Sequence, residues 1–513
     1  IIMMERGEYI SYANCGLPYY VGGVITDRKA LQVQTVEGFS KRFQVDVRTE
    51  NEVVSVDPEK KTVTVKRGEE TYVESYDKLV LSPGAGPVRP KISGMEENHV
   101  FTLRNIPDTY RIYDYIEENH PKTCAVVGAG FIGLEMAENL SERGLKVTVV
   151  EGAPHVMPPI DMDMAHQVHN YIRAKGLGLY LGQTVTAMDK EGVILSDGTK
   201  IQADMVLLSI GVRPDTAFLK DSGIELGARG EILVNKYMET NVPDVYALGD
   251  AASVVNIVSG ERTLIPLAGP ANKQGRIVGD NLCGRRSAYK GSQGTSIMKF
   301  FDMTVAVTGE KEESLLAKGR LYRKAITTSA CHAGYYPGAT PIHVKVLMGE
   351  AWEILGAQAV GTEGVDKLID VINASACDIS GCSCLSELNL CYAPPYGSAK
   401  APVNMLGMIA ENAEDELTRP ITPAQIPEGA LLLDVREPAE VAGGTIPGAV
   451  NIPLGDLRDR LGELPKDRPI VVFCKVGQRG YFAERLLSQR GYDVVNLSGG
   501  YTTWLAYKKA GLL

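Results

Sequence analysis

The sequence AVVGAGFIGLE, at residues 125–135, decides the fold of this chain. Its apolar start is typical of a buried strand, its glycines predict a tight turn, and its end begins a helix that we expect over residues 132–144. A second strand, expected at residues 146–150, is followed by Glu151, 23 residues after Gly128. Strand, glycine turn, helix, strand and acidic residue in this order predict a dinucleotide-binding βαβ unit.

Four residues of this unit are candidates for binding the cofactor. Gly128 permits the turn, Gly130 lets the backbone approach a pyrophosphate, and Gly133 allows the helix to pack closely on the strand. The N-terminus of the helix offers free N–H groups and a partial positive charge to the phosphates. Glu151 should accept hydrogen bonds from the adenosine ribose, and its charge would repel a 2′-phosphate. Because residues 152–161 contain no arginine, we predict NADH rather than NADPH.

The rest of the chain continues this alternation, with a strand expected over residues 205–210 and a helix over residues 164–175. Such alternation predicts the α/β class with parallel sheets. The 513 residues suffice for about three or four domains. The polar, acidic residues 410–418 predict a linker, after which a compact α/β unit begins at Ile421.

The net charge and the cysteine content argue against several classes of protein. The net charge of −10 argues against non-specific binding to nucleic acids or anionic membranes. No apolar run approaches the roughly 18 residues of a membrane span. Nine cysteines, an odd number in a large chain, argue against a disulfide framework. They suit a reducing cytoplasm and redox chemistry.

Three further segments extend the dinucleotide pattern: DVYALGD at residues 244–250, LSPGAG at residues 81–86 and LSIGVRP at residues 208–214. With the glycine turn, they resemble the flavoprotein disulfide reductase family with two dinucleotide-binding domains, over residues 1–410. This resemblance implies FAD as a cofactor, held at its ribityl chain by Asp250. The other cofactor contacts that we assign to these segments are Gly84, Ala85 and Gly211.

The beginning of the chain departs from that family. The FAD-binding unit of the family opens with its own strand, glycine turn and helix. Residues 1–4 of this chain resemble the second strand of that unit, with Glu5 as its ribose-binding acidic residue. We therefore expect this chain to lack about the first thirty residues of the unit, which leaves FAD binding by this polypeptide open.

The decapeptide SYANCGLPYY, at residues 11–20, carries a single cysteine, Cys15. The better-known members of the family have a second cysteine on this helix, where this chain has Tyr20. Cys15 must therefore cycle through a mixed disulfide, a persulfide or a sulfenate. The segment resembles the active-site stretch of coenzyme A (CoA) disulfide reductases and NADH-dependent persulfide reductases. That resemblance implies that Ser11 and Asn14 contact a CoA substrate.

Two tyrosine-rich segments match the same subfamily: GYYPG at residues 334–338 and CYAPPY at residues 391–396. In that subfamily, two tyrosines from the partner subunit reach the redox cysteine, where a phenol can donate a proton to a departing thiolate. We assign them to Tyr335 and Tyr392, which requires a homodimer. The neighbouring candidates, including a contact to a CoA phosphate, are Tyr336, Tyr396 and Lys400.

An additional cysteine cluster lies in the same region. Its members are Cys377, Cys382, Cys384 and Cys391. The spacing is not usual for zinc, so we favour spare thiols over a metal site and predict no metal.

The segments LLLDVRE, GTIPGAVNIP and VVFCKVGQRG resemble a rhodanese domain over residues 419–513. Cys474 ends a strand, and a six-residue loop follows, leading into a helix that we expect from Tyr481. Such a loop directs its N–H groups at the sulfur, and the helix dipole and Arg479 should lower the pKa of Cys474. A nucleophilic cysteine among hydrogen-bond donors suits sulfane-sulfur transfer. Thr445, where the family commonly has histidine, is expected away from the loop.

The predicted fold is α/β, with two Rossmann-like three-layer dinucleotide-binding domains, an α+β dimerisation domain and a C-terminal rhodanese domain. The expected domains are residues 1–120 (FAD-binding, first part), 121–240 (NADH-binding), 241–294 (FAD-binding, second part), 295–410 (dimerisation), 411–418 (linker) and 419–513 (rhodanese).

The resemblance implies an NADH-dependent flavoprotein that reduces CoA disulfide, CoA persulfide or polysulfide at Cys15. Cys474 would carry sulfane sulfur to or from that site, and the physiological substrate stays open. One alternative is an NADH oxidase or peroxidase that cycles Cys15 through a sulfenate. Another is a sulfur carrier or binding protein with an inactive flavin half.

Overall fold

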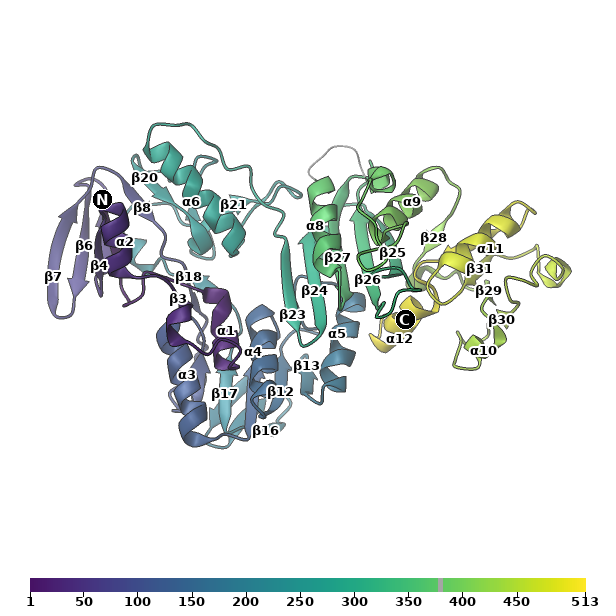
Figure 1. Cartoon of the computed structure of the whole chain (residues 1–513), viewed down its shortest axis with the longest axis horizontal. Helices are drawn as coiled ribbons and strands as arrows, with labels where there is room; N and C mark the ends of the chain where they lie inside the picture. The colour runs from purple at the N-terminus through teal and green to yellow at the C-terminus, as the bar shows by residue number, and fades with distance from the viewer. Residues whose placement is uncertain (377–381) are drawn as a thin grey trace. The chain divides into compact units, whose positions relative to one another are not determined.

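The computed structural model describes residues 1–376 and 382–513. The chain divides into two compact units, whose elements are labelled in Figure 1. The N-terminal unit comprises residues 1–157 and 172–294, and the C-terminal unit comprises residues 158–171 and 295–513. Within the described ranges, no helix has the length and apolar character needed to cross a lipid bilayer.

A five-stranded parallel sheet, in the order β10-β17-β11-β12-β13, organises the nucleotide-binding part of the N-terminal unit. Its strands and the helices that accompany them are β10 (Val100–Thr102), β11 (Thr123–Val127), β12 (Lys146–Glu151), β13 (Gly178–Leu181), β17 (Met205–Leu208), α3 (Ile106–Asn119) and α4 (Phe131–Glu142). The strand expected over residues 205–210 therefore ends two residues early. The backbone N–H of the next residue, Ser209, still donates a hydrogen bond to the Val127 carbonyl (2.8 Å), and its hydroxyl lies within hydrogen-bond distance of the carbonyls of Val127 (3.1 Å) and Gly128 (2.9 Å).

Smaller sheets surround a second apolar core in the N-terminal unit. Its parallel pairs are β1 (Ile2–Glu5) with β4 (Asp46–Thr49), β8 (Leu79–Leu81) with β20 (Val245–Ala247), and β19 (Ile232–Leu233) with β21 (Ala252–Val255). The antiparallel strands of the N-terminal unit are β2 (Ser11–Tyr12), β3 (Gln32–Gln34), β5 (Glu52–Asp57), β6 (Thr62–Arg67), β7 (Glu70–Ser75), β9 (Ala85–Pro87), β14 (Val185–Asp189), β15 (Gly192–Leu195), β16 (Lys200–Gln202), β18 (Val212–Pro214) and β22 (Arg262–Thr263). Of these, β14, β15 and β16 pack on the nucleotide-binding sheet. The helices are α1 (Leu17–Val21), α2 (Val36–Phe43) and α6 (Ala268–Leu282). Because β8 and β20 run parallel, the segments that follow them leave the same edge of the sheet.

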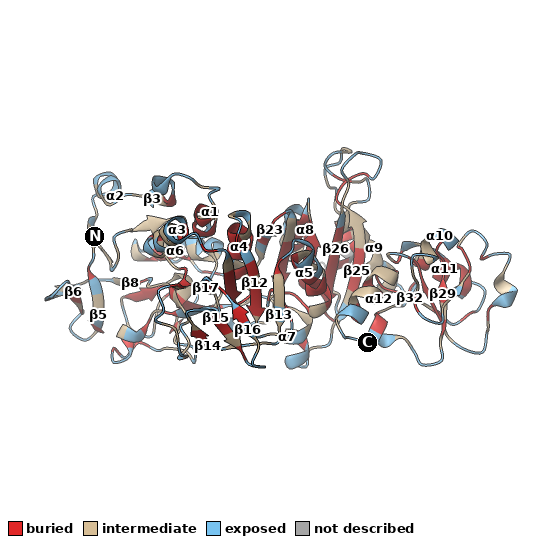
Figure 2. Ribbon diagram, turned by 90° about the horizontal axis from the view of Figure 1, so that it is seen from below, coloured by how far each residue is buried: buried red, intermediate tan, exposed pale blue. Residues whose placement is uncertain are grey.

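The first part of the C-terminal unit is an antiparallel sheet in the order β23-β24-β27-β26-β25. Its elements are β23 (Ser296–Phe300), β24 (Met303–Gly309), β25 (Arg323–Ala330), β26 (Pro341–Met348), β27 (Ile354–Gly361), α5 (Met162–Ala174), α7 (Glu312–Ala317), α8 (Val365–Ala376) and α9 (Pro402–Glu414). Figure 2 shows the buried residues along β25 and β26. Strand β27 is buried along its whole length, as expected of a strand inside a covered sheet.

The C-terminal part of this unit is a parallel five-stranded sheet in the order β28-β32-β31-β29-β30. Its elements are β28 (Pro420–Ile421), β29 (Leu431–Asp434), β30 (Val450–Asn451), β31 (Ile470–Phe473), β32 (Val494–Leu497), α10 (Pro438–Val441), α11 (Gln478–Ser488) and α12 (Gly500–Lys509). Apolar clusters lie on both faces of β31. Helix α9 continues to Glu414, so much of the segment expected to be a linker, 411–418, is helical.

Candidate functional site

The glycine turn of the nucleotide-binding sheet has the geometry that the sequence predicts. Gly128 has a φ of 100°, and a Cβ atom there would lie 2.5 Å from the Ser209 carbonyl oxygen. A Cβ atom at Gly133 would lie 1.9 Å from the Gly128 carbonyl oxygen, so only glycine lets α4 approach the turn. At Gly130, no atom lies within 4 Å of such a Cβ position. The turn is therefore tight on its protein side and open at Gly130, as a pyrophosphate would require.

Glu151 lies at the end of β12 beside this turn. One carboxylate oxygen accepts a hydrogen bond from the Ala129 N–H (2.7 Å), and the other accepts one from the Ala153 N–H (2.8 Å). The carboxylate is thus fixed, with lone pairs remaining for further donors. Gly211, in the segment after β17, has a φ of 110° and open space at its Cβ position.

Cys15 lies in a 3-10 turn, Asn14–Gly16, directly before α1, and its thiol is exposed. Helix α1 packs on α4, the helix that starts at the glycine turn. At the end of α1, a Cβ atom at Gly22 would lie 1.9 Å from Oδ1 of Asn139, and Arg143 donates a hydrogen bond to the Val21 carbonyl (2.9 Å). The fold therefore holds the single redox candidate against the nucleotide-binding helix.

Burial and two carboxylates act on the Cys15 thiol. Desolvation by burial, together with the charges of Glu135 and Asp250, raises the pKa of the thiol. Glu135 lies on α4, where burial and the nearby Glu138 raise its pKa to about 7. Glu135 closes the dinucleotide motif, but we did not predict it as a site residue, because the motif does not show which face of the helix meets Cys15.

The residues that the resemblance implies for FAD lie near the carboxyl ends of β8 and β20. Burial raises the pKa of Asp250, and the positive charge of Arg104 opposes that shift. Arg104 also lies against Gly84, where a Cβ atom would be 2.5 Å from a guanidinium nitrogen. Gly249 has a φ of 77° and open space beside it. A half-buried carboxyl beside an open glycine backbone fits the polar chain of a flavin, and Arg104 is a further residue that we did not predict.

Other predicted cofactor and substrate residues of the N-terminal unit lie on neighbouring strands. Glu5, at the end of β1, accepts a hydrogen bond from the Gly7 N–H (2.7 Å). Ser11 lies in β2, opposite Gln34 of β3. Ala85 begins β9 and is buried.

The structure brings together Tyr335 and Tyr392, which are 57 residues apart in the sequence. Their hydroxyl oxygens lie 2.7 Å apart, and this hydrogen bond raises the pKa of Tyr335. Both rings are exposed, 75% for Tyr335 and 48% for Tyr392. Tyr336 instead packs its ring against His332, which makes it the weaker candidate. Tyr396 and Lys400 are exposed.

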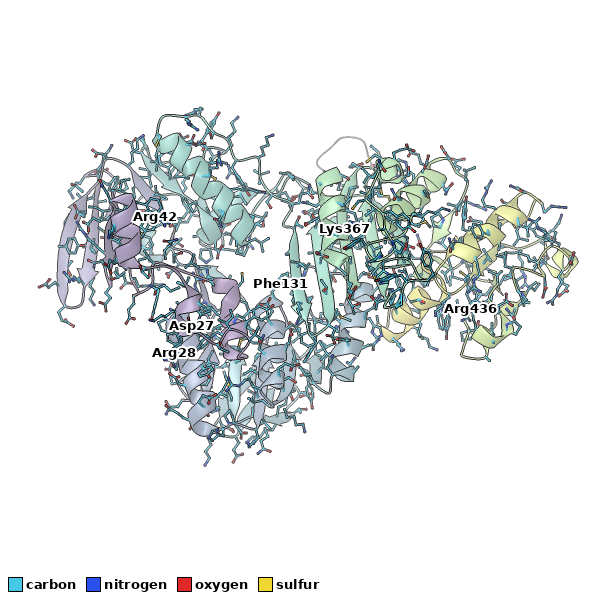
Figure 3. All side chains as sticks on the ribbon, viewed as in Figure 1. Asp27, Arg28, Arg42, Phe131, Lys367 and Arg436 are labelled. Atoms are coloured by element: carbon cyan, nitrogen blue, oxygen red, sulfur yellow. The ribbon has the colours of Figure 1, made fainter. Side chains whose placement is uncertain are left out.

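The additional cysteine cluster contains no described disulfide. Cys382 is buried, Cys384 is half-buried, and Cys391 is exposed, while Cys377 lies outside the described residues. Lys367 of α8, labelled in Figure 3, donates a hydrogen bond to Sγ of Cys391 (3.7 Å).

The loop after β31 surrounds Cys474 as expected. The Gly477 N–H donates a hydrogen bond to Sγ of Cys474 (3.2 Å), and the φ of Gly477 is 103°. The following helix begins at Gln478, earlier than the predicted Tyr481, which places Arg479 in its first turn. The left-handed Gly477 lets the chain turn into the helix at once.

Glu440 of α10 is the partner of Arg479, and we did not predict it. Two parallel hydrogen bonds, of 2.6 and 2.7 Å, join the guanidinium to the carboxylate. These bonds lower the pKa of Glu440 to about 2. They raise the pKa of Arg479, to which the nearby Cys474 also contributes. Arg479 is therefore held between a carboxylate and the sulfur.

Thr445 has a structural role behind the loop. Its hydroxyl donates a hydrogen bond to the Asp434 carboxylate (2.7 Å), which is buried and paired with Arg436 at 2.6 Å. Arg436, labelled in Figure 3, also donates to the Gly444 carbonyl (2.8 Å). Thr445 thus stabilises the buried pair at the end of β29.

A second charged cluster lies in the C-terminal unit. Oxygens of Asp161, Asp163 and Glu312 approach one another within 4.8 Å, as metal ligands do. Nζ of Lys345 lies 2.9, 2.6 and 2.6 Å from these three carboxylates. The ammonium group occupies the position that a cation would take, so this cluster is an internal ion-pair network.

Comparison with known proteins identifies two families along this chain. A family model described as pyridine nucleotide-disulphide oxidoreductase matches residues 1–275, and one described as rhodanese-like domain matches residues 415–507. The coenzyme A disulfide reductase of Staphylococcus aureus is 37% identical over 415 residues, covering 80% of this chain and 94% of that protein.

Two solved structures match nearly the whole chain. The crystal structure of reduced Bacillus anthracis CoADR-RHD has a TM-score of 0.97 at 48% identity and covers 99% of this chain and 94% of that one. The structure of a NAD-dependent persulfide reductase from A. fulgidus has a TM-score of 0.92 at 35% identity and covers 98% of this chain and 95% of that one. The chain therefore belongs to the pyridine nucleotide-disulphide oxidoreductase family and carries a C-terminal rhodanese-like domain.

Proposed function

We propose that this protein is an NADH-dependent flavoprotein reductase of CoA disulfide, CoA persulfide or polysulfide. The observation that carries the proposal is the placement of Cys15, an exposed thiol directly before α1. Helix α1 packs on α4, the helix that follows the dinucleotide turn. The similarity to a coenzyme A disulfide reductase and to a persulfide reductase supports sulfur substrates.

FAD is the cofactor that the family and the residues of the N-terminal unit support. When bound, it would supply the relay of electrons between the nicotinamide and sulfur. Asp250 would bind its ribityl chain, Glu5 its ribose, and the backbone at Gly84 and Ala85 would lie against it. The half-buried Asp250 carboxyl and the open space at Gly249 support this assignment.

Glu151 supports NADH over NADPH, because a fixed carboxylate accepts ribose hydroxyl groups but repels a 2′-phosphate. The turn at Gly128, Gly130 and Gly133 would hold the pyrophosphate, with Gly211 facing the same end of the sheet. The preference for NADH over NADPH therefore directly tests the proposed role of the Glu151 side chain.

Cys15 would act as the nucleophile toward the substrate. Its thiolate attacks one sulfur of a disulfide RSSR, forms a Cys15–S–S–R bond and releases RS⁻, which takes up a proton. Over the whole reaction, one NADH and one proton convert RSSR to two thiols, or RSSH to a thiol and H₂S. Because burial and the nearby carboxylates raise the pKa of Cys15, the thiol keeps its proton at neutral pH and needs a base to remove it before the attack. Glu135, with a pKa of about 7, is suited to exchange that proton.

We further propose a homodimer in which the tyrosine pair of one subunit serves Cys15 of the other. Tyr335 and Tyr392 share a hydrogen bond and leave their rings exposed, so one phenol can support the other while it donates a proton to the departing thiolate. Ser11, Asn14 and Lys400 are the proposed CoA contacts.

Cys474 would carry sulfane sulfur as a persulfide on the rhodanese-like domain. The Gly477 N–H and the Arg479 guanidinium lie beside its sulfur and would stabilise its negative charge. The sulfane sulfur that Cys474 would accept or release is the same kind of sulfur that Cys15 would reduce.

The test compares three forms of the full-length, FAD-loaded protein: wild type, Cys15→Ser and Cys283→Ser, an exposed thiol of the same unit as the matched control. NADH should bleach the flavin in all three. Only Cys15→Ser should lose NADH oxidation driven by CoA persulfide. Persulfide reduction that persists in this variant would refute the role of Cys15. Faster turnover with hydrogen peroxide than with CoA persulfide would favour an oxidase or peroxidase instead.

A further inference from the structure

Helix α12 begins on the backbone of the Cys474 loop. The N–H groups of Tyr501 and Thr502 donate hydrogen bonds to the carbonyls of Cys474 (2.8 Å) and Lys475 (3.0 Å). Gly500 lies so close that a Cβ atom there would be 2.4 Å from the Cys474 carbonyl oxygen. The first turn of α12 therefore fixes the backbone from which the Cys474 sulfur projects.

The other end of α12 reaches the charged cluster beside the antiparallel sheet. Nζ of Lys324, on β25, donates a hydrogen bond to the Tyr507 hydroxyl (3.2 Å) and pairs with Glu312 at 2.6 Å. Glu312 in turn pairs with the fully buried Lys345. Burial, with the charges of Asp163 and Glu312, raises the pKa of Tyr507, so the phenol stays neutral in this network.

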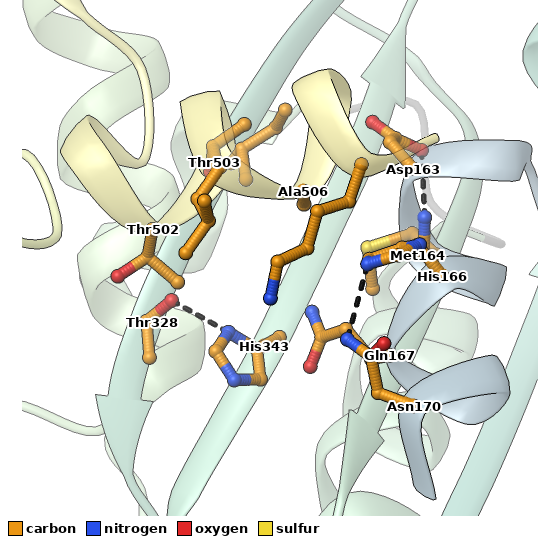
Figure 4. A pocket seen from close by; sticks show the side chains of 13 residues that line it. Asp163, Met164, His166, Gln167, Asn170, Thr328, His343, Thr502, Thr503 and Ala506 are labelled. Atoms are coloured by element: carbon orange, nitrogen blue, oxygen red, sulfur yellow. Dashed lines mark hydrogen bonds between the residues drawn. The ribbon is translucent and has the colours of Figure 1, made fainter. Parts of the chain in front are cut away.

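Between these ends, α12 does not pack closely on the sheet. A cavity of about 170 Å³ lies between α12, the strands β25 and β26, and α5, lined by Thr503, Thr328 and His343 among others (Figure 4). The Thr328 hydroxyl and Nδ1 of His343 form a hydrogen bond of 2.8 Å across the two strands. In the middle of α12, Trp504 packs into the apolar cluster of the rhodanese-like sheet, whereas Tyr507 bonds the helix to the antiparallel sheet through Lys324.

We propose that Tyr507 and Lys324 are positioning residues for sulfur transfer at Cys474. Together they anchor α12 to the antiparallel sheet, and α12 holds the carbonyls of the loop in the geometry that directs the Gly477 N–H at the sulfur. The rhodanese-like loop is thereby coupled to the reductase part of the same unit. This inference rests on the proposed role of Cys474 in carrying sulfane sulfur.

The experiment measures thiosulfate:cyanide sulfurtransferase activity of the full-length protein in wild type, Tyr507→Phe and Lys324→Met. A matched control is Tyr492→Phe. This variant also removes one buried phenol hydroxyl, but Tyr492 donates to the Leu461 carbonyl (2.7 Å) within the rhodanese-like part itself. We expect kcat/KM to fall about two- to tenfold in Tyr507→Phe and in Lys324→Met, the range of one hydrogen bond, and to stay unchanged in Tyr492→Phe.

Two further measurements separate positioning from general destabilisation. The rate of Cys474 alkylation by iodoacetamide, followed by mass spectrometry across pH, should shift in Tyr507→Phe and Lys324→Met but not in Tyr492→Phe. The double variant should lose no more activity than either single variant, because both remove the same anchor. Additive losses, or an unchanged alkylation profile in both variants, would overturn the proposal.

Failure of the proposed function is distinguishable from failure of this inference. If wild type and Cys474→Ser show equal sulfurtransferase activity, the role of Cys474 is wrong, whereas the alkylation profile still tests the coupling through α12. If wild type is active and Cys474→Ser is not, equal activity of Tyr507→Phe and wild type refutes the coupling alone.

Discussion

Replacing Lys345 by methionine should strongly destabilise the C-terminal unit. The Lys345 side chain is 0% exposed, and its ammonium lies within 2.9 Å of three carboxylates. Without it, Asp161 and Asp163 lose their buried cation, while Glu312 keeps the ion pair with Lys324 and the hydrogen bond from the Tyr322 hydroxyl. Removing one partner of a buried ion pair costs about 3–5 kcal/mol, because the remaining charge stays desolvated.

The lowered pKa of Glu312 also indicates how much this network stabilises the folded protein. It falls from 4.5 to about 2 through Lys345 and Lys324, against the opposing effect of burial. That fall corresponds to about 3 kcal/mol of stability. Since the folded pKa is lowered, this contribution is complete above pH 4.5 and is lost as the pH falls toward 2. The difference between wild type and Lys345→Met should therefore be largest near neutral pH and shrink below pH 4.5.

Urea unfolding followed by tryptophan emission is the appropriate assay. The only two tryptophans of the chain, Trp352 and Trp504, both lie in the C-terminal unit, so the signal reports on that unit. The matched control is Lys311→Met, which removes a half-exposed pair with Glu313 and should cost about 0–1 kcal/mol. Equal unfolding midpoints for Lys345→Met and Lys311→Met at neutral pH would show that the buried network does not stabilise this unit.

Three further outcomes are expected from single substitutions. Gly133→Ala should abolish NADH binding, measured by fluorescence titration, because its Cβ would lie 1.9 Å from the Gly128 carbonyl oxygen; an unchanged Kd would contradict this geometry. Glu151→Ala should raise the KM for NADH. It should also reduce the preference for NADH over NADPH, measured as the ratio of kcat/KM values, about tenfold, which corresponds to one charge-assisted hydrogen bond. An unchanged preference would show that Glu151 does not select the nucleotide. Glu440→Gln should lower sulfurtransferase activity at neutral pH by releasing Arg479. Because the pKa of Glu440 is lowered to about 2, its carboxylate stays ionised in the folded protein well below neutral pH. Wild type should therefore keep its advantage over Glu440→Gln throughout the pH range above about 4.5, and equal activities in that range would argue against this role.

Local sequence patterns were sufficient to predict those parts of the sites that a single short segment forms. The glycine turn, the acidic residue after the second strand and the Cys474 loop all lie as predicted, because glycine conformations and strand ends are set by neighbouring residues. The pairing of Tyr335 with Tyr392 is consistent with the resemblance of their two segments to a known subfamily, although 57 residues separate them. Helix ends were less certain, as the start of α11 at Gln478 shows.

Only the tertiary structure identified the partners of the charged groups. The charge of Glu135 acts on the Cys15 thiol, Arg479 pairs with Glu440, and Lys345 pairs with carboxylates as distant in the sequence as Asp161. The sequence alone cannot show these pairs, because a buried charge is satisfied by whichever opposite charge the packing of distant elements places beside it. The type of fold and its reactive residues therefore follow from local sequence, whereas the pKa values and anchoring of those residues follow from contacts between remote segments.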